Sequence, residues 1–128
     1  MSNVFSATAL TLSLLATAVT AQAASYNLCS VAGGCKATGS VSVSSTYTKT
    51  KYPLVFAHGM AGFSKVGPVD YWYGIPKDLV AGGSSVYATQ VASFQSSEVR
   101  GEQLLAQAQN ILAISGAATI NLIGHRHG

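Results

Sequence analysis

Residues 124–128 have the spacing of a turn that presents a nucleophile. They read Gly124-His125-Arg126-His127-Gly128 and follow an apolar run. Glycines two positions before and after a central residue let the backbone pack closely around a sharp strand-to-helix turn, as in the Gly-x-Ser-x-Gly nucleophile elbow. In that elbow the central serine attacks an acyl carbon, whereas Arg126 stays protonated and has no lone pair to offer. The pattern therefore predicts an elbow whose nucleophile position is occupied by arginine.

A second glycine-containing loop, His58-Gly59-Met60, follows an apolar run that ends at Ala57. Acyl transfer places negative charge on a carbonyl oxygen, and a backbone N–H group aimed at that oxygen stabilises the reaction by about 3–4 kcal/mol. One such donor comes from the loop after an earlier strand, and another from the residue that follows the nucleophile. The presence of both loops strengthens the prediction of an acyl-transfer site.

Three histidines, His58, His125 and His127, raise the alternative of a metal site. A His-x-His pair can chelate a metal ion, but no cysteine or carboxylate lies beside it at the spacing of a ligand. We therefore expect no metal site and interpret the three histidines as residues of the elbow and of the earlier loop.

The segments that must position these loops alternate between strand and helix. Apolar residues at helical spacing predict a long helix that Ser97 caps and Gly116 ends. In chain order the predicted elements are a strand at 52–57, a short helix within 70–79, a strand at 85–91, the long helix, and a strand at 118–123. This alternation indicates an α/β fold with a parallel sheet, in which ligands bind beyond the carboxyl ends of the strands. Both glycine-containing loops are predicted at that edge.

The first 45 residues differ in composition from the rest of the chain. Residues 4–24 are apolar or small, and Ala21-Gln22-Ala23 has the small-x-small pattern of a secretory cleavage site. We therefore expect a signal peptide at 1–23, secretion through the periplasm, and no integral membrane segment after signal removal. An uncleaved anchor is the alternative, although its many Thr and Ser residues make it a weak membrane span. Residues 24–45 are rich in Ser, Gly, Ala and Val, and we expect a flexible N-terminal extension there.

Cys29 and Cys35 are the only two cysteines in the chain. In an oxidising compartment they are candidates for a local disulfide, which would close a short loop and stabilise little. Hydrophobic residues make up 48% of the chain and charged residues 9%, which excludes a disordered protein. The net charge of +3 comes from scattered Lys and Arg residues, so we expect no nucleic-acid partner.

Several runs of sequence resemble secreted bacterial lipases of the foldase-dependent true-lipase family. These runs are 52–60, 69–76, 97–104 and 121–125. The resemblance covers nearly everything from Thr46 to the end of the chain. It implies that 46–128 is a partial α/β-hydrolase domain, a three-layer parallel β-α-β-α-β arrangement truncated after the nucleophile strand. The run at 120–123 would then be a bare apolar edge, which invites pairing with other chains.

The resemblance also implies triacylglycerol lipase activity at a lipid interface, through a serine acyl-enzyme mechanism. The backbone N–H groups of Met60 and His127 would be the oxyanion donors, and Arg126 stands where the family has serine. The other residues that the resemblance places in the elbow or the oxyanion loop, or beside them as a brace, are His58, Gly59, Gly124, His125, Gly128, Asp70, Tyr71 and Trp72. No organic cofactor is implied, the family's calcium site would lie beyond residue 128, and a lipase-specific foldase would be a partner.

Two departures from the family bear on activity. Arg126 replaces the serine, and the family places its catalytic acid and histidine after the nucleophile, beyond Gly128. We therefore expect the chain as written to be inactive. Three explanations stay open: a sequence error (one base change interconverts Ser and Arg codons), a partial sequence, or a true truncation. Two other functions also stay open, a remnant that only binds foldase or lipid, and another acyl hydrolase such as a thioesterase.

Overall fold

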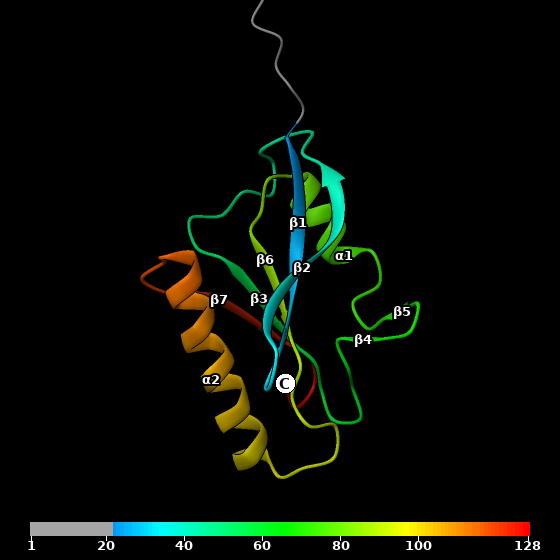
Figure 1. Ribbon diagram of the computed structural model, residues 1–128, viewed down its shortest axis with the longest axis vertical. Helices are drawn as coiled ribbons and strands as arrows, with labels where there is room; N and C mark the ends of the chain where they lie inside the picture. The colour runs from blue at the N-terminus through cyan, green and yellow to red at the C-terminus, as the bar shows by residue number, and fades with distance from the viewer. Residues whose placement is uncertain (1–21) are drawn as a thin grey trace, which may run out of the picture.

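The computed structural model describes residues 22–128 (Figure 1). The predicted signal peptide at 1–23 lies outside the described residues except for Gln22 and Ala23. Within the described part, no helix combines the length and the apolar character needed to cross a membrane. The elements found there are β1 (Ala23–Ser30), β2 (Gly34–Ser42), β3 (Leu54–Ala57), β4 (Lys65–Val66), β5 (Val69–Asp70), α1 (Ile75–Ala81), β6 (Val86–Thr89), α2 (Ser97–Ser115) and β7 (Asn121–Gly124).

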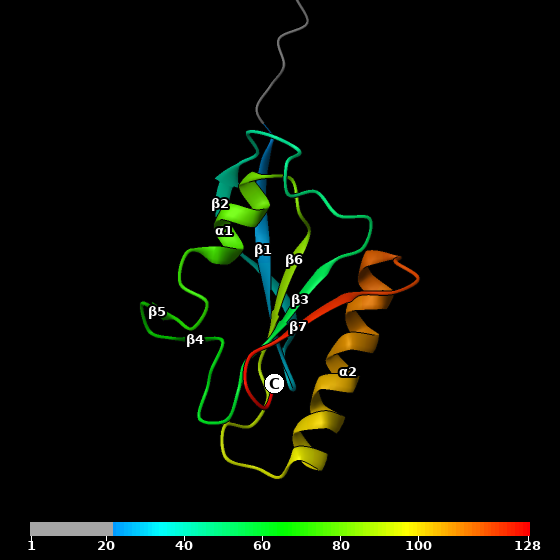
Figure 2. The ribbon, with the colours of Figure 1, turned by 180° about the vertical axis from the view of Figure 1, so that it is seen from behind.

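The main sheet has five strands among the described residues, in the order β2-β1-β6-β3-β7. β1 runs parallel to β6, β6 to β3, and β3 to β7, whereas β2 is antiparallel to β1. β4 and β5 form a small antiparallel pair of their own. A mostly parallel sheet whose strands alternate with helices is an α/β fold (Figures 1 and 2).

The two helices cover opposite faces of the sheet. On one face Val80 of α1 packs with Leu54 and Phe56, and on the other face Ile111 of α2 packs with Val55. This division follows from the alternation of side chains along β3, because successive residues of a strand point to opposite faces. With both faces covered, all four residues of β3 and all four of β6 are buried, which explains their nearly continuous apolar runs.

The segment at 24–45 differs from the flexible extension that its composition predicts. It forms a β-hairpin of β1 and β2, and β1 joins the sheet by pairing with β6 through Asn27 and Leu28. Tyr26 is 2% exposed and Cys29 is 1% exposed, so both belong to the core. The hairpin is thus part of the fold, and the boundary expected at residue 46 does not separate it from the sheet.

Gly39 shows why the glycine content of this segment was misleading. Its φ is +61°, and a methyl group at this position would lie 2.6 Å from Cε1 of Tyr26. The glycine therefore lets β2 cross over the Tyr26 ring at close range, and it is a packing requirement of the strand. Composition alone does not distinguish this use of glycine from a flexible linker.

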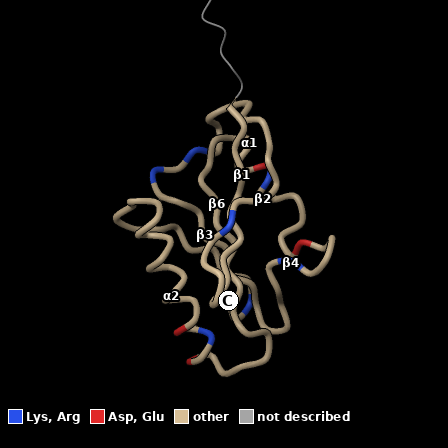
Figure 3. Tube along the Cα trace, viewed as in Figure 1, with Lys and Arg blue, Asp and Glu red and all other residues tan. Residues whose placement is uncertain are grey.

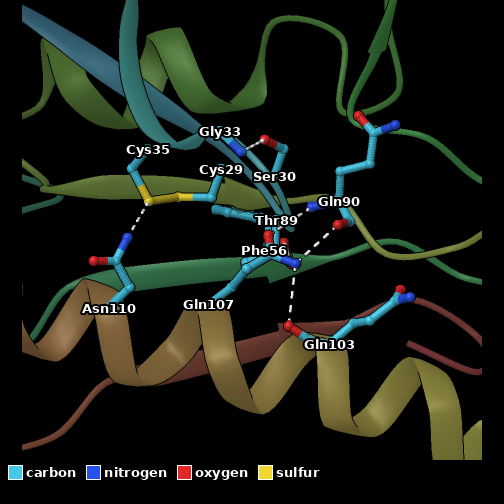
Figure 4. The surroundings of a disulfide bond; sticks show 10 residues. All are labelled: Cys29, Ser30, Gly33, Cys35, Phe56, Thr89, Gln90, Gln103, Gln107 and Asn110. Carbon is cyan, nitrogen blue, oxygen red and sulfur yellow. Dashed lines mark hydrogen bonds between the residues drawn. A yellow bond between two sulfur atoms is a disulfide. The ribbon is translucent and has the colours of Figure 1, made fainter.

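A disulfide joins Cys29 and Cys35, with the two sulfur atoms 1.97 Å apart (Figure 4). The two residues are opposite each other in the antiparallel register of β1 and β2. Cys29 packs with Val55 and Ile111, and Nδ2 of Asn110 lies 3.9 Å from Sγ of Cys35. The disulfide thus lies between the hairpin and α2, at the face of the sheet that this helix covers.

Helix boundaries differ by a few residues from those predicted. Ser96, and not Ser97, is the N-cap of α2, because its backbone is extended and its side chain accepts a hydrogen bond from the Val99 N–H. Gly116 has a φ of +67° and ends the helix as expected. The short helix expected within 70–79 begins at Ile75, next to Pro76, and extends to Ala81, two residues beyond the predicted range.

β7 is an edge strand in the described part of the sheet, and its four residues are all exposed. Leu122 is 53% exposed, so this edge has the apolar character that the sequence predicts for it. Among residues 22–128, charged residues are few and lie scattered along the trace (Figure 3).

Candidate functional site

The backbone at 124–128 forms a sharp turn at the carboxyl end of β7. Arg126 has a φ of +57°, which is rare for a residue with a side chain and costs on the order of 1–3 kcal/mol. The His125 N–H donates to the Ala57 carbonyl oxygen at 3.1 Å, and the Gly128 N–H donates to the His125 carbonyl oxygen at 3.2 Å. The residue in the predicted nucleophile position therefore has the strained backbone of a nucleophile elbow, although it is an arginine.

Glycine is required at three positions around this turn. A methyl group at Gly124 would lie 2.7 Å from the Gly128 carbonyl oxygen, and one at Gly128 would collide with the Ala57 carbonyl oxygen. A methyl group at Gly59 would lie 2.6 Å from the His125 carbonyl oxygen. The spacing of glycines seen in the sequence thus corresponds to the close packing of two loops, the turn at 124–128 and the loop that follows β3.

We expect Gly59→Ala to destabilise the protein by about 1–3 kcal/mol, because the added methyl group forces the two loops apart. Gly101→Ala is the matched control, since Gly101 lies in α2 with no atom within 4 Å of an added methyl group. That control should stabilise the protein by roughly 0.5–1 kcal/mol through helix propensity. Urea denaturation of the two variants measures both changes, and equal stability of Gly59→Ala and the unsubstituted protein would refute the close contact.

The predicted oxyanion donors lie in these two loops. Neither the Met60 N–H nor the His127 N–H has a hydrogen-bond partner among residues 22–128. A methyl group at Gly59, the residue before Met60, would also lie 3.2 Å from Cβ of Arg126, so the two loops touch beside these donors. Both N–H groups thus lie on loops that touch each other, and neither is used by the described residues.

His58 is a structural residue of this site. It is 1% exposed, its Nε2 accepts a hydrogen bond from the Val91 N–H at 3.2 Å, and its Nδ1 lies 3.0 Å from the Gly59 carbonyl oxygen. Since Nε2 accepts, the proton must be on Nδ1, which donates to Gly59. Both ring nitrogens are occupied in holding the loop, so His58 is not free to act as a base.

Arg100 of α2 is a residue of this site that the sequence motifs do not single out. Its Nη1 donates to the His127 carbonyl oxygen at 3.0 Å and its Nη2 donates to the His58 carbonyl oxygen at 2.9 Å. The side chain is 4% exposed, and its Nε has no partner among the described residues. One guanidinium group therefore joins the elbow to the loop after β3, as its planar fork of donors allows.

Aromatic side chains form the other border of the elbow. The Tyr71 hydroxyl lies 2.6 Å from Nδ1 of His125, and the Trp72 ring packs against Phe56 with centroids 4.8 Å apart. Oδ1 of Asp70 accepts a hydrogen bond from the Trp72 N–H at 3.0 Å. The run 70–72, expected as a brace, thus contacts the elbow through Tyr71 and the core through Trp72.

Tyr26 supports Asp70 from β1, and its hydroxyl donates to Oδ2 of Asp70 at 2.7 Å. Burial, together with this hydrogen bond and the negative charge of Asp70, raises the pKa of Tyr26 from 10.0 to about 12. The stabilisation that this tyrosine provides is complete below pH 10 and is lost as the pH rises toward 12, because the unfolded chain ionises first.

We therefore expect the free energy of unfolding to fall more steeply between pH 10 and 12 in the unsubstituted protein than in Tyr26→Phe. Urea denaturation at several pH values in this window measures the two slopes, and lysine titration contributes equally to both proteins. Identical slopes would show that Tyr26 ionises as readily in the folded protein as in the unfolded one.

Two cavities lie near these residues. One of about 220 Å³ lies between the elbow and α2, and its lining includes His58, Arg100 and His127. A larger one of about 610 Å³ lies away from the elbow, beside Tyr26, and is bordered by Lys65 of β4 and by residues of α1, β2 and β5. Among residues 22–128, no three His, Cys, Asp or Glu side chains are grouped so that they could hold a metal ion.

Comparison with known proteins gives several bacterial relatives, while no family model matches the chain. A triacylglycerol lipase of Vibrio cholerae is 52% identical over 82 residues, which are 64% of this chain and 26% of that protein. A triacylglycerol lipase of Pseudarthrobacter phenanthrenivorans is 48% identical over 87 residues, covering 65% of this chain and 27% of that protein. A triacylglycerol lipase of Burkholderia plantarii is also 48% identical over 87 residues, which are 65% of this chain and 24% of that protein. Over about two thirds of its length the chain is therefore similar to bacterial triacylglycerol lipases, and it spans about a quarter of the length of those it matches.

Proposed function

We propose that this chain forms the oxyanion-hole side of a serine ester hydrolase site of the triacylglycerol lipase type. The observation that carries the proposal is the left-handed backbone of Arg126, which stands at the end of β7 against the Gly59 loop. A strained turn of this kind persists only where the surrounding structure fixes it, and such turns are concentrated at functional sites. The similarity to proteins named triacylglycerol lipase supports ester hydrolysis as the reaction.

In this proposal the Met60 and His127 N–H groups stabilise the negative charge that forms on the ester carbonyl oxygen. A serine at position 126 would attack the carbonyl carbon and transfer its proton to a general base, and the alcohol would leave as the acyl-enzyme forms. Arg126 offers no nucleophile. Nδ1 of His125 lies against Tyr71, and His58 holds its own loop. The chain as it stands is therefore proposed to be catalytically inactive.

The replacement of the nucleophile favours a second candidate, a protein that binds lipid or a lipase-specific foldase without hydrolysing esters. The same fold also accommodates other acyl hydrolases, such as thioesterases. Secretion belongs to the proposal as well, and the disulfide between Cys29 and Cys35 supports it, since disulfides persist in oxidising compartments.

The test is a graft in which residues 22–128, carrying Arg126→Ser, replace the matching segment of the Vibrio cholerae lipase. We call this protein the serine graft. If the proposal is right, the serine graft hydrolyses triacylglycerol emulsions faster than acyl thioesters at equal concentration. A folded graft that binds emulsion droplets without releasing fatty acid would overturn ester hydrolysis in favour of binding. A preference for thioesters would instead identify a thioesterase.

A further inference from the structure

The N-terminal hairpin reaches the elbow through a short series of hydrogen bonds. Tyr26 of β1 donates to Oδ2 of Asp70, 44 positions later in the chain. Tyr26 also belongs to the core cluster under α1 and is 2% exposed, so packing of its ring restrains its hydroxyl. The hairpin thus supplies one rigid donor to a segment that borders the candidate site.

Asp70 fixes the backbone of that segment with both carboxylate oxygens. Oδ2 accepts from Tyr26, and Oδ1 accepts from the Trp72 N–H. The Asp70 carbonyl oxygen also accepts from the Tyr73 N–H at 3.1 Å. Tyr73 has a φ of +53° although it is not a glycine, a strained conformation that persists only when neighbouring contacts determine it. The Ile75 N–H also donates to the Trp72 carbonyl oxygen at 3.2 Å, so the anchored Asp70 is one of two backbone acceptors that hold this turn.

Tyr71 lies between the two anchored residues Asp70 and Trp72, and it is the one that contacts the elbow. Its hydroxyl lies 2.6 Å from Nδ1 of His125, the residue before the nucleophile position. Its ring also packs against the rings of Phe63 and Trp72, edge to face, with centroids 5.6 Å and 5.1 Å apart. A shift of Asp70 would therefore move the Tyr71 hydroxyl relative to His125.

We propose that Tyr26 is a positioning residue for the elbow: by holding Asp70 it places Tyr71 against His125 and fixes the orientation of the turn at 124–128. The hairpin of β1 and β2 thereby belongs to the site as well as to the sheet. The catalytic consequence of this role rests on the proposed function, whereas the effect on His125 does not. The hydrogen bonds that join Tyr26 to Asp70, Asp70 to its neighbours, and Tyr71 to His125 have donor–acceptor distances of 2.6–3.1 Å.

The test compares conservative variants in the 128-residue protein, with the nitrogen chemical shifts of the His125 ring in NMR spectra as the readout. Tyr71→Phe removes the bond to His125 and defines the full change. Tyr26→Phe should shift the His125 ring nitrogens in the same direction by a substantial part of that change. Tyr87→Phe is the matched control, because Tyr87 is a buried tyrosine on the neighbouring strand that packs on the opposite face of the sheet. It should leave His125 unchanged.

Asp70→Ala provides a second variant, should Tyr26→Phe unfold. Alanine removes both the acceptor of the Tyr26 hydroxyl and the acceptor of the Trp72 N–H. It should change the His125 signals at least as much as Tyr26→Phe. Unchanged His125 signals in Tyr26→Phe or Asp70→Ala, with a clear change in Tyr71→Phe, would overturn the role of Tyr26.

The serine graft supplies the catalytic readout. Because small misplacements in an active site cost up to about 100-fold in rate, we expect Tyr26→Phe in this graft to lower kcat by roughly 10-fold with little change in KM. An equal kcat with and without Tyr26→Phe would exclude a catalytic consequence of the positioning. A serine graft that is inactive even with Tyr26 in place would overturn the proposed function alone, since the His125 comparison decides the role of Tyr26 by itself.

Discussion

The serine graft, which carries Arg126→Ser, should hydrolyse esters roughly a million-fold faster than the same graft with Arg126 unchanged. Removing the nucleophile of a serine hydrolase costs on the order of 10⁶-fold in kcat, and only the contribution of the oxyanion hole and of binding remains. Arginine should be at least as damaging as alanine, because its cationic side chain occupies the place where the acyl carbon must approach. The left-handed backbone already present at position 126 means that serine needs no rearrangement of the turn.

Release of fatty acid from an emulsion measures this difference, and labelling by a fluorophosphonate measures nucleophilicity separately. The serine graft should react with the label, whereas the graft with Arg126 unchanged and the graft with Arg126→Ala should not. The Arg126→Ala graft is the control for folding and lipid binding. Similar activities of the Arg126→Ser and Arg126→Ala grafts would show that position 126 is not the nucleophile position.

Arg100→Met should destabilise the 128-residue protein by about 2–4 kcal/mol. Methionine fills a similar volume but carries no charge. Replacing buried charges by apolar side chains can leave stability unchanged when both partners of an ion pair are replaced together. Here the acceptors remain, because the carbonyl oxygens of His58 and His127 belong to the backbone. A hydrogen bond to a charged group contributes about 1.5–3 kcal/mol, and a buried acceptor left unpaired adds a penalty, so the loss should exceed the relief of desolvation.

Urea denaturation measures this change, with Glu102→Ala on the exposed side of the same helix as the control. The control should change stability by less than about 0.5 kcal/mol. Arg100→Lys should be intermediate, because an ammonium group cannot bridge two carbonyl oxygens with the geometry of a guanidinium fork. Full native stability of Arg100→Met would mean that the two loops hold each other without the arginine.

The central strands could be predicted from the sequence because burial on both faces leaves a strong signal. β3 and β6 are continuous apolar runs, and their order with the helices is enough to indicate a parallel sheet. The N-terminal hairpin could not be predicted in this way. β2 is an edge strand with many exposed residues, so its sequence carries little alternation and resembles a linker.

The glycines of the candidate site were predictable because their spacing reflects a local steric need. Arg100 was not predicted, since its two acceptors lie 27 and 42 positions away and only the fold brings them together. One signal was present in the sequence: Arg100 lies at helical spacing from the apolar residues Leu104 and Ile111, four and eleven positions later. A cation on the buried stripe of an amphipathic helix is rarely found without a partner.

The Cys29–Cys35 disulfide has a consequence for the order in which the chain acquires its structure. The two cysteines are six positions apart, and both strands of their hairpin lie within the first 42 residues of the sequence. Contacts between residues close in sequence form before those that require a long loop to close. The oxidised hairpin can therefore be complete before the more distant contact of β1 with β6 forms, and β1 then presents a finished edge on which β6 aligns.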